Sequence, residues 1–185
     1  DARISLNQNL RHNPTDVQNE AVKRLQHELP DVMVRFEPTT GATRTLSRPV
    51  GFLTHELRSD DPKTVALEFV TRHLATLGLE AADVEGRELT DEVVSDVTGA
   101  THVYWRQTLD GVPVYNGQLH VNLDRHGRVQ SVNNAFVPNL SRAANSLRPR
   151  LSGEEAVAKA LASLGMDAAP TALTTGNDAR QTTRV

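Results

Sequence analysis

The sequence predicts an α+β fold in which one helix packs against a four-stranded antiparallel sheet. Four runs of strand-forming residues lie between residues 86 and 137, and only two to four residues separate each run from the next. Connections this short join antiparallel neighbours. One connection is Asp110-Gly111, a pair that suits the positive φ angles of a two-residue hairpin turn. A helical stretch with a wide apolar arc precedes the four runs.

The strands of this expected meander are separated by residues typical of turns. The connections are Thr98-Gly99-Ala100, Asp110-Gly111 and the stretch 124–127, each of which contains glycine. We place the four strands at residues 86–97, 101–109, 112–123 and 128–137.

Side-chain alternation assigns two faces to this sheet. His120 and Asn122 should point away from the helix, whereas Trp105 is interpreted as a core residue packed near Phe69. The apolar residues expected to share a face within the second and third strands are Val103, Trp105, Leu109, Leu119, Val121 and Leu123.

Pro113 gives the third strand a special position. Proline cannot donate a hydrogen bond to a neighbouring strand, so this strand should lie at an edge or carry a bulge, with Gly117 as a second irregularity. An open edge could pair with an extended strand of another chain.

The helix that should cover the sheet has clear limits. Asp60 or Asp61 can cap its start, Pro62 fits its first turn, and Gly78 can end it in a left-handed conformation. A helix that is apolar over so wide an arc is expected to be buried against a sheet. Its apolar residues are Val65, Leu67, Phe69, Val70, Leu74 and Leu77.

The N-terminal fifty residues predict a helix and a small hairpin. Thr15 and Gln18 have the spacing of a capping box, in which each side chain bonds the other's backbone N–H. The helix should run over 16–29 and stop at Pro30. Strands at 32–37 and 43–47 should form the hairpin. We expect the inner side of the helix to carry Val17, Val22, Leu25 and Leu29.

The C-terminal part follows a polar linker at 139–149. Ser152 and Glu155 form a second capping-box pattern, which starts an alanine-rich helix that ends near Gly165. The N-terminal helix and hairpin and this C-terminal helix are expected to form a second, similar unit. Residues 166–185 are polar and rich in threonine, as if the strands that complete this unit lay further on.

Composition excludes several functional classes. The formal charge of −3 gives no basic field for nucleic acid, and the absence of cysteine rules out disulfides and thiolate metal sites. No run of about 18 apolar residues suggests a membrane helix. The first residues lack a signal-peptide pattern and an initiator methionine, which favours a trimmed N-terminus.

Catalytic and metal-binding patterns are incomplete. A zinc peptidase helix needs a second histidine four residues after the first, but Asp31 and Ser59 stand four residues after His27 and His55. His102, His120 and His126 fall in the expected sheet and are interpreted as exposed strand and turn residues. We therefore expect no catalytic, metal or cofactor site in this chain.

Several stretches between residues 30 and 165 carry a resemblance to a known family. They are Val32 to Gly41, Gly51 to Thr54, Ala66 to Leu79 and, above all, Thr101-His-Val-Tyr-Trp-Arg-Gln107 with Asp110-Gly-Val-Pro-Val-Tyr-Asn-Gly117. These resemble the prosegment of fungalysin-type secreted zinc metallopeptidases, and more distantly the thermolysin-type prosegment. The stretch 151–160 resembles the start of the PepSY module that ends such prosegments.

This resemblance implies a role and a set of partners. The chain would be the propeptide of a secreted precursor, acting as intramolecular chaperone and inhibitor by docking on the catalytic domain and obstructing its cleft. The fold would be cystatin-like, which agrees with the helix and meander inferred above. Zinc, with calcium left open, would belong to the partner domain, and neither nucleic acid nor a membrane is expected as a partner.

The resemblance also implies a division of the chain and a set of contact residues. Residues 1–50 would form the N-terminal helix and hairpin, 51–140 the cystatin-like propeptide unit, and 141–185 a linker with the first half of a PepSY-like module. The contacts expected with the enzyme are Tyr115, Thr182, Thr183, Arg184 and Val185.

An alternative function belongs to a different class. The chain could be a stand-alone, cystatin-like binding or protease-inhibitor module that acts in trans, because the fold alone does not decide function. A peptidase sequence with an HExxH motif downstream in the same gene would favour the prosegment. A stop codon near residue 185 would favour the stand-alone module.

Overall fold

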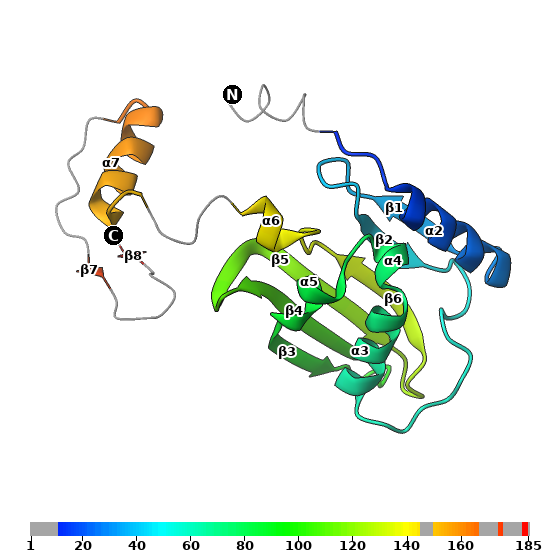
Figure 1. The fold of residues 1–185 in the computed structure, drawn as a ribbon. Coiled ribbons are helices and arrows are strands. Elements are labelled where there is room, and N and C mark those ends of the chain that lie inside the picture. The colour runs from blue at the N-terminus through cyan, green and yellow to red at the C-terminus, as the bar shows by residue number, and fades with distance from the viewer. Residues whose placement is uncertain (1–10, 145–149, 167–173, 176–182, 185) are drawn as a thin grey trace. The chain divides into compact units, whose positions relative to one another are not determined.

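The structure is a computed structural model that describes residues 11–144, 150–166, 174–175 and 183–184 (Figure 1). The chain divides into two compact units, residues 1–109 with 113–143 and residues 110–112 with 144–185. The three-part division expected from the sequence stays a prediction.

The larger unit contains a six-stranded sheet with the order β1-β2-β6-β5-β4-β3. Its helices are α2 (Asp16–Glu28), α3 (Pro62–Arg72), α4 (Leu74–Leu77), α5 (Ala81–Glu85) and α6 (Leu140–Ala143). Its strands are β1 (Met33–Phe36), β2 (Thr43–Ser47), β3 (Glu88–Val94), β4 (Thr101–Leu109), β5 (Val112–Leu123) and β6 (Val129–Asn134).

The expected meander is confirmed as strands β3 to β6, but the strand count of four is wrong. The hairpin β1–β2 joins the same sheet, because β2 pairs antiparallel with β6 through Leu46 opposite Val132. The N-terminal hairpin therefore does not form a second unit with the C-terminal helix. The buried side chain of Leu46 explains the choice, since it extends the core made by the meander.

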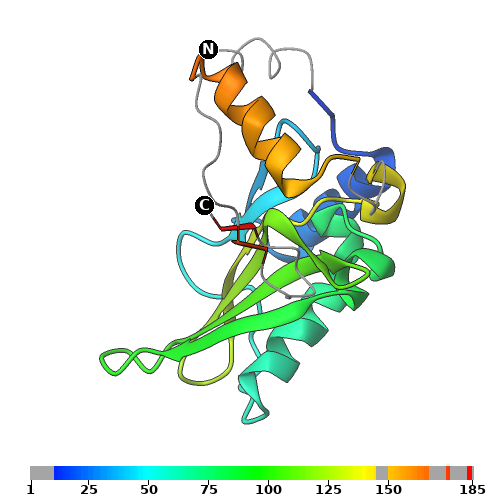
Figure 2. The ribbon, with the colours of Figure 1, turned by 90° about the vertical axis from the view of Figure 1, so that its left-hand side faces the viewer.

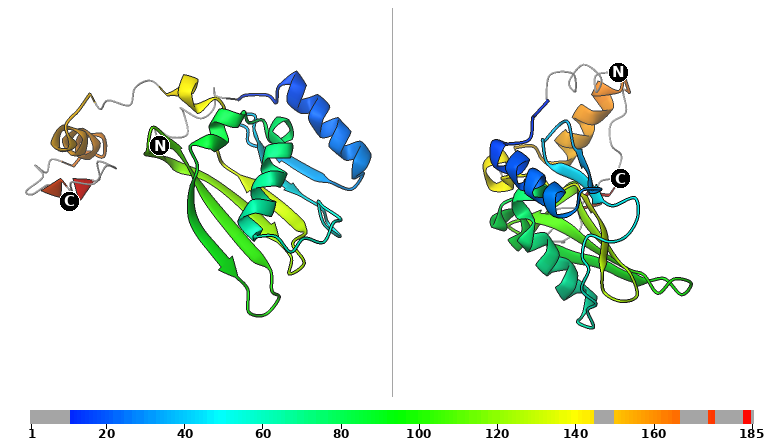
Figure 3. Two further views of the ribbon diagram at one scale, coloured as in Figure 1. Left: turned by 60° about the horizontal axis from the view of Figure 1, so that its bottom comes forward. Right: turned by 90° about the vertical axis from the view of Figure 1, so that its right-hand side faces the viewer.

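One face of the sheet is covered by helices, as Figures 2 and 3 show for α3. Trp105 is only 4% exposed and belongs to the same buried cluster as Phe69, so its assignment to the core is confirmed. Val103, Leu119, Val121 and Leu123 are buried in that cluster as well. Leu109, at the end of β4, is only half-buried.

The Asp110-Gly111 hairpin is confirmed. Asp110 and Gly111 have φ angles of 48° and 78°, as a type I′ turn requires. β5, however, is an inner strand of the sheet, so the alternative of an edge strand is wrong. The two edges are β1 and β3. The irregularity expected in β5 appears at Asn116, where φ is 57°.

The expected helix 62–78 is divided into α3 and α4 at His73. The N-cap is Asp61, Pro62 occupies the first turn, and Gly78 ends α4 with φ 73°. The N–H of Leu79 bonds the carbonyl of Leu74 at 2.9 Å, which satisfies the last turn.

The capping box expected at α2 is half right. The hydroxyl of Thr15 accepts the N–H of Gln18 at 3.1 Å, but the Gln18 side chain turns inward and donates to the Thr43 hydroxyl at 3.1 Å. Thr43 in turn donates to the carbonyl of Thr76. Gln18 thus links α2, β2 and α4. The inner side of α2 carries Gln18 and Ala21, whereas Val17, which was expected there, is 65% exposed.

The smaller unit contains α7 (Gly153–Ser163) and a two-stranded sheet of β7 (Thr174–Thr175) and β8 (Thr183–Arg184). The capping box of α7 is confirmed. The N–H of Glu155 bonds the Ser152 hydroxyl at 3.2 Å, and the N–H of Ser152 bonds a carboxylate oxygen of Glu155 at 2.8 Å. No residue of α7 is buried.

Candidate functional site

The face of the sheet opposite α3 carries the best candidate site, which we call the open face. Its residues alternate with the buried core positions of the three central strands β4, β5 and β6, so their side chains point away from the helix. They are His102, Tyr104, Arg106, Gln118, His120, Asn122, Ser131 and Asn133.

Polar and aromatic contacts connect these residues across the strands. Nδ1 of His102 lies 2.5 Å from Oδ1 of Asn122, and the Asn122 amide donates to the Ser131 hydroxyl at 2.8 Å. The rings of Tyr104 and His120 stack with centroids 4.1 Å apart and planes 13° from parallel. The open face is therefore an ordered surface rather than a set of independent side chains.

His120 occupies the centre of this surface. Burial lowers the pKa of its imidazole, the neighbouring His102 lowers it further, and the Asn122 side chain opposes both. The lowered pKa favours the neutral form of the His120 side chain. Its Nε2 atom is buried and has no hydrogen-bond partner among the described residues. Buried polar atoms without a partner are rare in folded proteins, which sets His120 apart from the other residues of the open face.

A hollow of about 670 Å³ lies over this part of the sheet. Tyr104, Gln118 and His120 line it from the open face, while Glu37 and Arg44 line it from β2 and the turn before it. Its volume falls in the roughly 300–1,000 Å³ range of ligand sites. A second hollow of about 340 Å³ shares Tyr115, Asn116 and Gln118 with the first.

Tyr115 is the one expected contact residue whose side chain the structure describes. It is 91% exposed on β5, beside the left-handed Asn116, and lines both hollows. Thr183 and Arg184 lie in β8, with only their backbone described, and Thr182 and Val185 lie outside the described residues.

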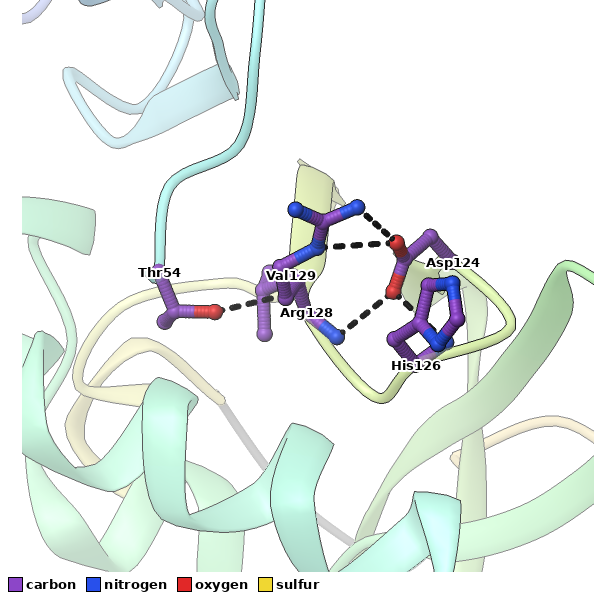
Figure 4. A network of polar contacts seen from close by, with 5 residues as sticks. All are labelled: Thr54, Asp124, His126, Arg128 and Val129. Atoms are coloured by element: carbon purple, nitrogen blue, oxygen red, sulfur yellow. Dashed lines mark hydrogen bonds and ion pairs between the residues drawn. The ribbon is translucent and has the colours of Figure 1, made fainter. Parts of the chain in front are cut away.

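The histidines do not gather into a metal site. No group of three or more histidine, aspartate or glutamate side chains in the described ranges could hold an ion. His102 and His120 have ring centroids 5.8 Å apart, whereas His126 belongs to the turn after β5. There Asp124 accepts the N–H groups of His126 and Arg128 and pairs with the Arg128 guanidinium at 2.6 Å (Figure 4).

This turn is structural. The Arg128 guanidinium lies 3.7 Å from the ring centroid of Phe52. The Thr54 hydroxyl accepts the N–H of Val129 at 2.9 Å, as Figure 4 shows. These contacts hold the segment before α3 against β6. Asp124 thus stabilises the turn after β5, as expected from the sequence.

Two features of the site could not be predicted from the sequence. Tyr104 was not expected to stack on His120, since that contact depends on the register of β4 against β5. The contribution of Glu37 and Arg44 depends on the pairing of β2 with β6, which joins residues about 90 positions apart. Alternation in β5 was the signal that could have been extended to β4 and β6 to find the whole open face.

The strands that build the open face coincide with a known sequence motif. Residues 88–136 match the family described as Fungalysin/Thermolysin Propeptide Motif. They begin at the first residue of β3 and end just after β6. The α+β unit therefore contains a propeptide motif.

Relatives of known name agree with this match. The chain is 50% identical over 50 residues to extracellular metalloproteinase 10 of Uncinocarpus reesii, covering 27% of this chain and 8% of the relative. It is 34% identical over 102 residues to extracellular metalloproteinase MEP of Leptosphaeria maculans, covering 49% and 15%. The identity to extracellular metalloproteinase mep of Aspergillus fumigatus is 34% over 70 residues, covering 38% and 10%.

These matches confirm the resemblance to the prosegment of fungalysin-type metallopeptidases. They span only a small part of each relative, 15% or less of the three lengths. The names of the relatives are those of extracellular enzymes. None of the helices in the described part of the chain has the length and apolar character that a bilayer crossing requires.

Proposed function

We propose that this chain is the propeptide of a secreted, fungalysin-like zinc metallopeptidase and acts as its intramolecular chaperone and inhibitor. The observation that carries the proposal is the match of residues 88–136 to a propeptide motif, which coincides with strands β3 to β6. The extracellular metalloproteinases among the relatives support the same precursor. The catalytic domain of that precursor is the proposed partner, and zinc belongs to it.

The proposed mechanism is steric. The chain docks on the catalytic domain, obstructs its cleft and supplies no reactive group of its own. Covalent linkage within the precursor raises the local concentration of the propeptide, so a modest intrinsic affinity suffices for latency. After cleavage, only the docked area holds the two parts together.

The contact residues proposed from the sequence fit this scheme in two ways. Tyr115 is a large, fully displayed aromatic side chain, a residue type that often dominates the energy of an interface. The residues Thr182 to Val185 would lie toward the catalytic cleft in the manner of a substrate, as a polar, extended segment.

A role in folding follows from the same docking. A chain that binds the native peptidase and not its unfolded form stabilises the native form by mass action. If it also binds the folding transition state, it accelerates folding.

Inhibition is tested by titrating the mature peptidase of the same precursor with this chain, using a peptide substrate. Saturable loss of activity at a 1:1 ratio is expected. Full activity at saturating chain would refute the inhibitory role. A comparison with an unrelated metallopeptidase distinguishes the alternative, because a stand-alone inhibitor acting in trans would inhibit both enzymes.

The chaperone role is tested separately by diluting denatured peptidase into buffer with and without the chain. The yield of active enzyme, measured after removing the chain by proteolysis, should rise with chain concentration. An equal concentration of serum albumin is the control. An unchanged yield would show that the propeptide does not assist folding.

A further inference from the structure

The open face has an unusual composition for a surface exposed to water. Arg106 is its one permanently charged residue, and the other seven carry amide, hydroxyl, imidazole or phenol groups. Exposed sheet faces usually carry lysine and glutamate. β3, at the edge of the same sheet, follows that rule with Asp91, which is exposed and lies opposite Tyr104. A surface depleted in charge and containing aromatic rings has the composition of an interface core.

The open face is also ordered before any partner binds. The chain of contacts from His102 through Asn122 to Ser131 fixes side chains on three neighbouring strands. The Tyr104–His120 stack fixes two more. Side chains that are already immobilised lose little entropy on binding, so such a surface is suited to a specific partner.

The hollow over this face indicates what kind of group it would accept. Its lining contains one acid, Glu37, and one base, Arg44, so the two charges balance. The remaining groups donate and accept hydrogen bonds in the way that peptide groups require.

The geometry of β5 favours an extended occupant. The pairing of β5 with β6 runs from Leu119 to Leu123, and the carbonyl of Gln118 accepts the N–H of Ala135. Residues 112–117 therefore continue past the end of that pairing. Tyr115 and Asn116 of this part line both hollows, so an occupant there would lie beside a stretch of β5 that β6 leaves unpaired.

We propose that the open face binds an extended, uncharged segment of the peptidase catalytic domain, which lies along the projecting part of β5 and over the Tyr104–His120 stack. This inference rests on the proposed function and identifies the docking surface within it. The occupant is uncharged because the two charges that line the hollow, Glu37 and Arg44, balance each other, and because the open-face residues of β4, β5 and β6 include no acidic side chain.

The test places one charge on this surface and the same charge elsewhere. Gln118 is exposed on the open face, lines both hollows and has no recorded side-chain hydrogen bond among the described residues. Gln118→Lys therefore adds a cation without removing a contact of the folded chain. Gln26→Lys is the matched control, since Gln26 is an exposed residue of α2. Circular dichroism and thermal melting verify that both variants fold.

Inhibition constants are measured for the full chain and both variants against the mature peptidase of the same precursor. Gln118→Lys should raise the inhibition constant by at least about 10-fold, as expected when an unpaired charge is buried at an interface. Gln26→Lys should leave it within about 2-fold. Tyr115→Ala, at the rim of the two hollows, should also weaken inhibition.

The other outcomes overturn the inference in distinguishable ways. Equal inhibition by the full chain and Gln118→Lys would show that docking uses another surface, and the proposed function would stand. Tighter inhibition by Gln118→Lys would identify an acidic occupant. Loss of self-association in Gln118→Lys with unchanged inhibition would identify a second copy of this chain. If the unaltered chain neither binds nor inhibits, the proposed function fails as well.

Discussion

Asp83 is a buried carboxylate on which the stability of the larger unit depends. Its side chain accepts the backbone N–H of Glu80 at 2.9 Å, which caps α5. It also accepts the N–H groups of Asn139 and Leu140, each at 3.0 Å, where the chain leaves the sheet. Asp83 is only 4% exposed, so water cannot easily replace these bonds. We predict that Asp83→Ala strongly destabilises the larger unit.

The magnitude follows from the three donors that lose their acceptor. A buried donor left without a partner costs about 1–3 kcal/mol. Glu80 lies at a helix end near solvent and Asn139 and Leu140 are half-buried, which favours the lower part of that range for each. The expected loss in the free energy of unfolding is therefore about 3–5 kcal/mol. Asp83→Asn keeps one acceptor oxygen and should lose about half as much.

The assay is urea unfolding followed by the fluorescence of Trp105, the single tryptophan of the chain, which is buried in the affected unit. Asp96→Asn is the control, because Asp96 is exposed and should change the free energy by less than about 0.5 kcal/mol. If Asp83→Ala and Asp96→Asn have the same urea midpoint, the three hydrogen bonds do not stabilise the fold as argued.

Two further predictions concern glycine and histidine. A methyl group at Gly127, where φ is 74°, would collide with the carbonyl of Arg58, whereas one at Gly111, where φ is 78°, would meet open space. Gly111→Ala should therefore lower the free energy of unfolding by about 1 kcal/mol and Gly127→Ala by clearly more. Equal urea midpoints for the two variants would contradict this. Burial lowers the pKa of His73, with Arg72 acting in the same direction and Glu28 opposing. Around and below the ordinary value of 6.5 the unfolded chain thus binds more protons, so stability falls as the pH is lowered through about 6.5. His73→Gln should show a smaller decline, and an identical decline would exclude His73 as a cause.

Local signals in the sequence were sufficient for the meander. Asp110-Gly111 and the glycines at the other turns fix the conformations between strands, and alternation in β5 separates buried Leu119 from outward His120. Pro62 and Gly78 likewise marked the limits of the helical segment. Each of these signals lies within a few neighbouring residues, so it can be interpreted without knowing the rest of the fold.

Features that depend on distant contacts were not predicted. The hairpin β1–β2 joins the sheet through the pairing of Leu46 with Val132, which no local pattern reveals. Gln18 leaves its expected cap because Thr43 offers a buried partner. The division of the long helix at His73 has the same character, since nothing at that position in the sequence breaks a helix.

The candidate site shows a similar limit. His120 and Asn122 were correctly expected to face away from the helix. Their organisation into a surface depends on Tyr104 and Ser131, which come from neighbouring strands and are brought together only by the register of the sheet. Of the contact residues expected from the family resemblance, Tyr115 is exposed on β5. Its role and that of Thr182 to Val185 stay predictions.

The proposed function and the proposed docking surface both require the sheet of this chain to bind a metallopeptidase catalytic domain. Hydrogen–deuterium exchange of the chain, alone and in a 1:1 mixture with the mature peptidase of the same precursor, measures this directly. We predict slower exchange in β4 and β5 of the mixture and unchanged exchange in α2. Slower exchange confined to α2 and α3, or no difference anywhere at saturating peptidase, would contradict the account.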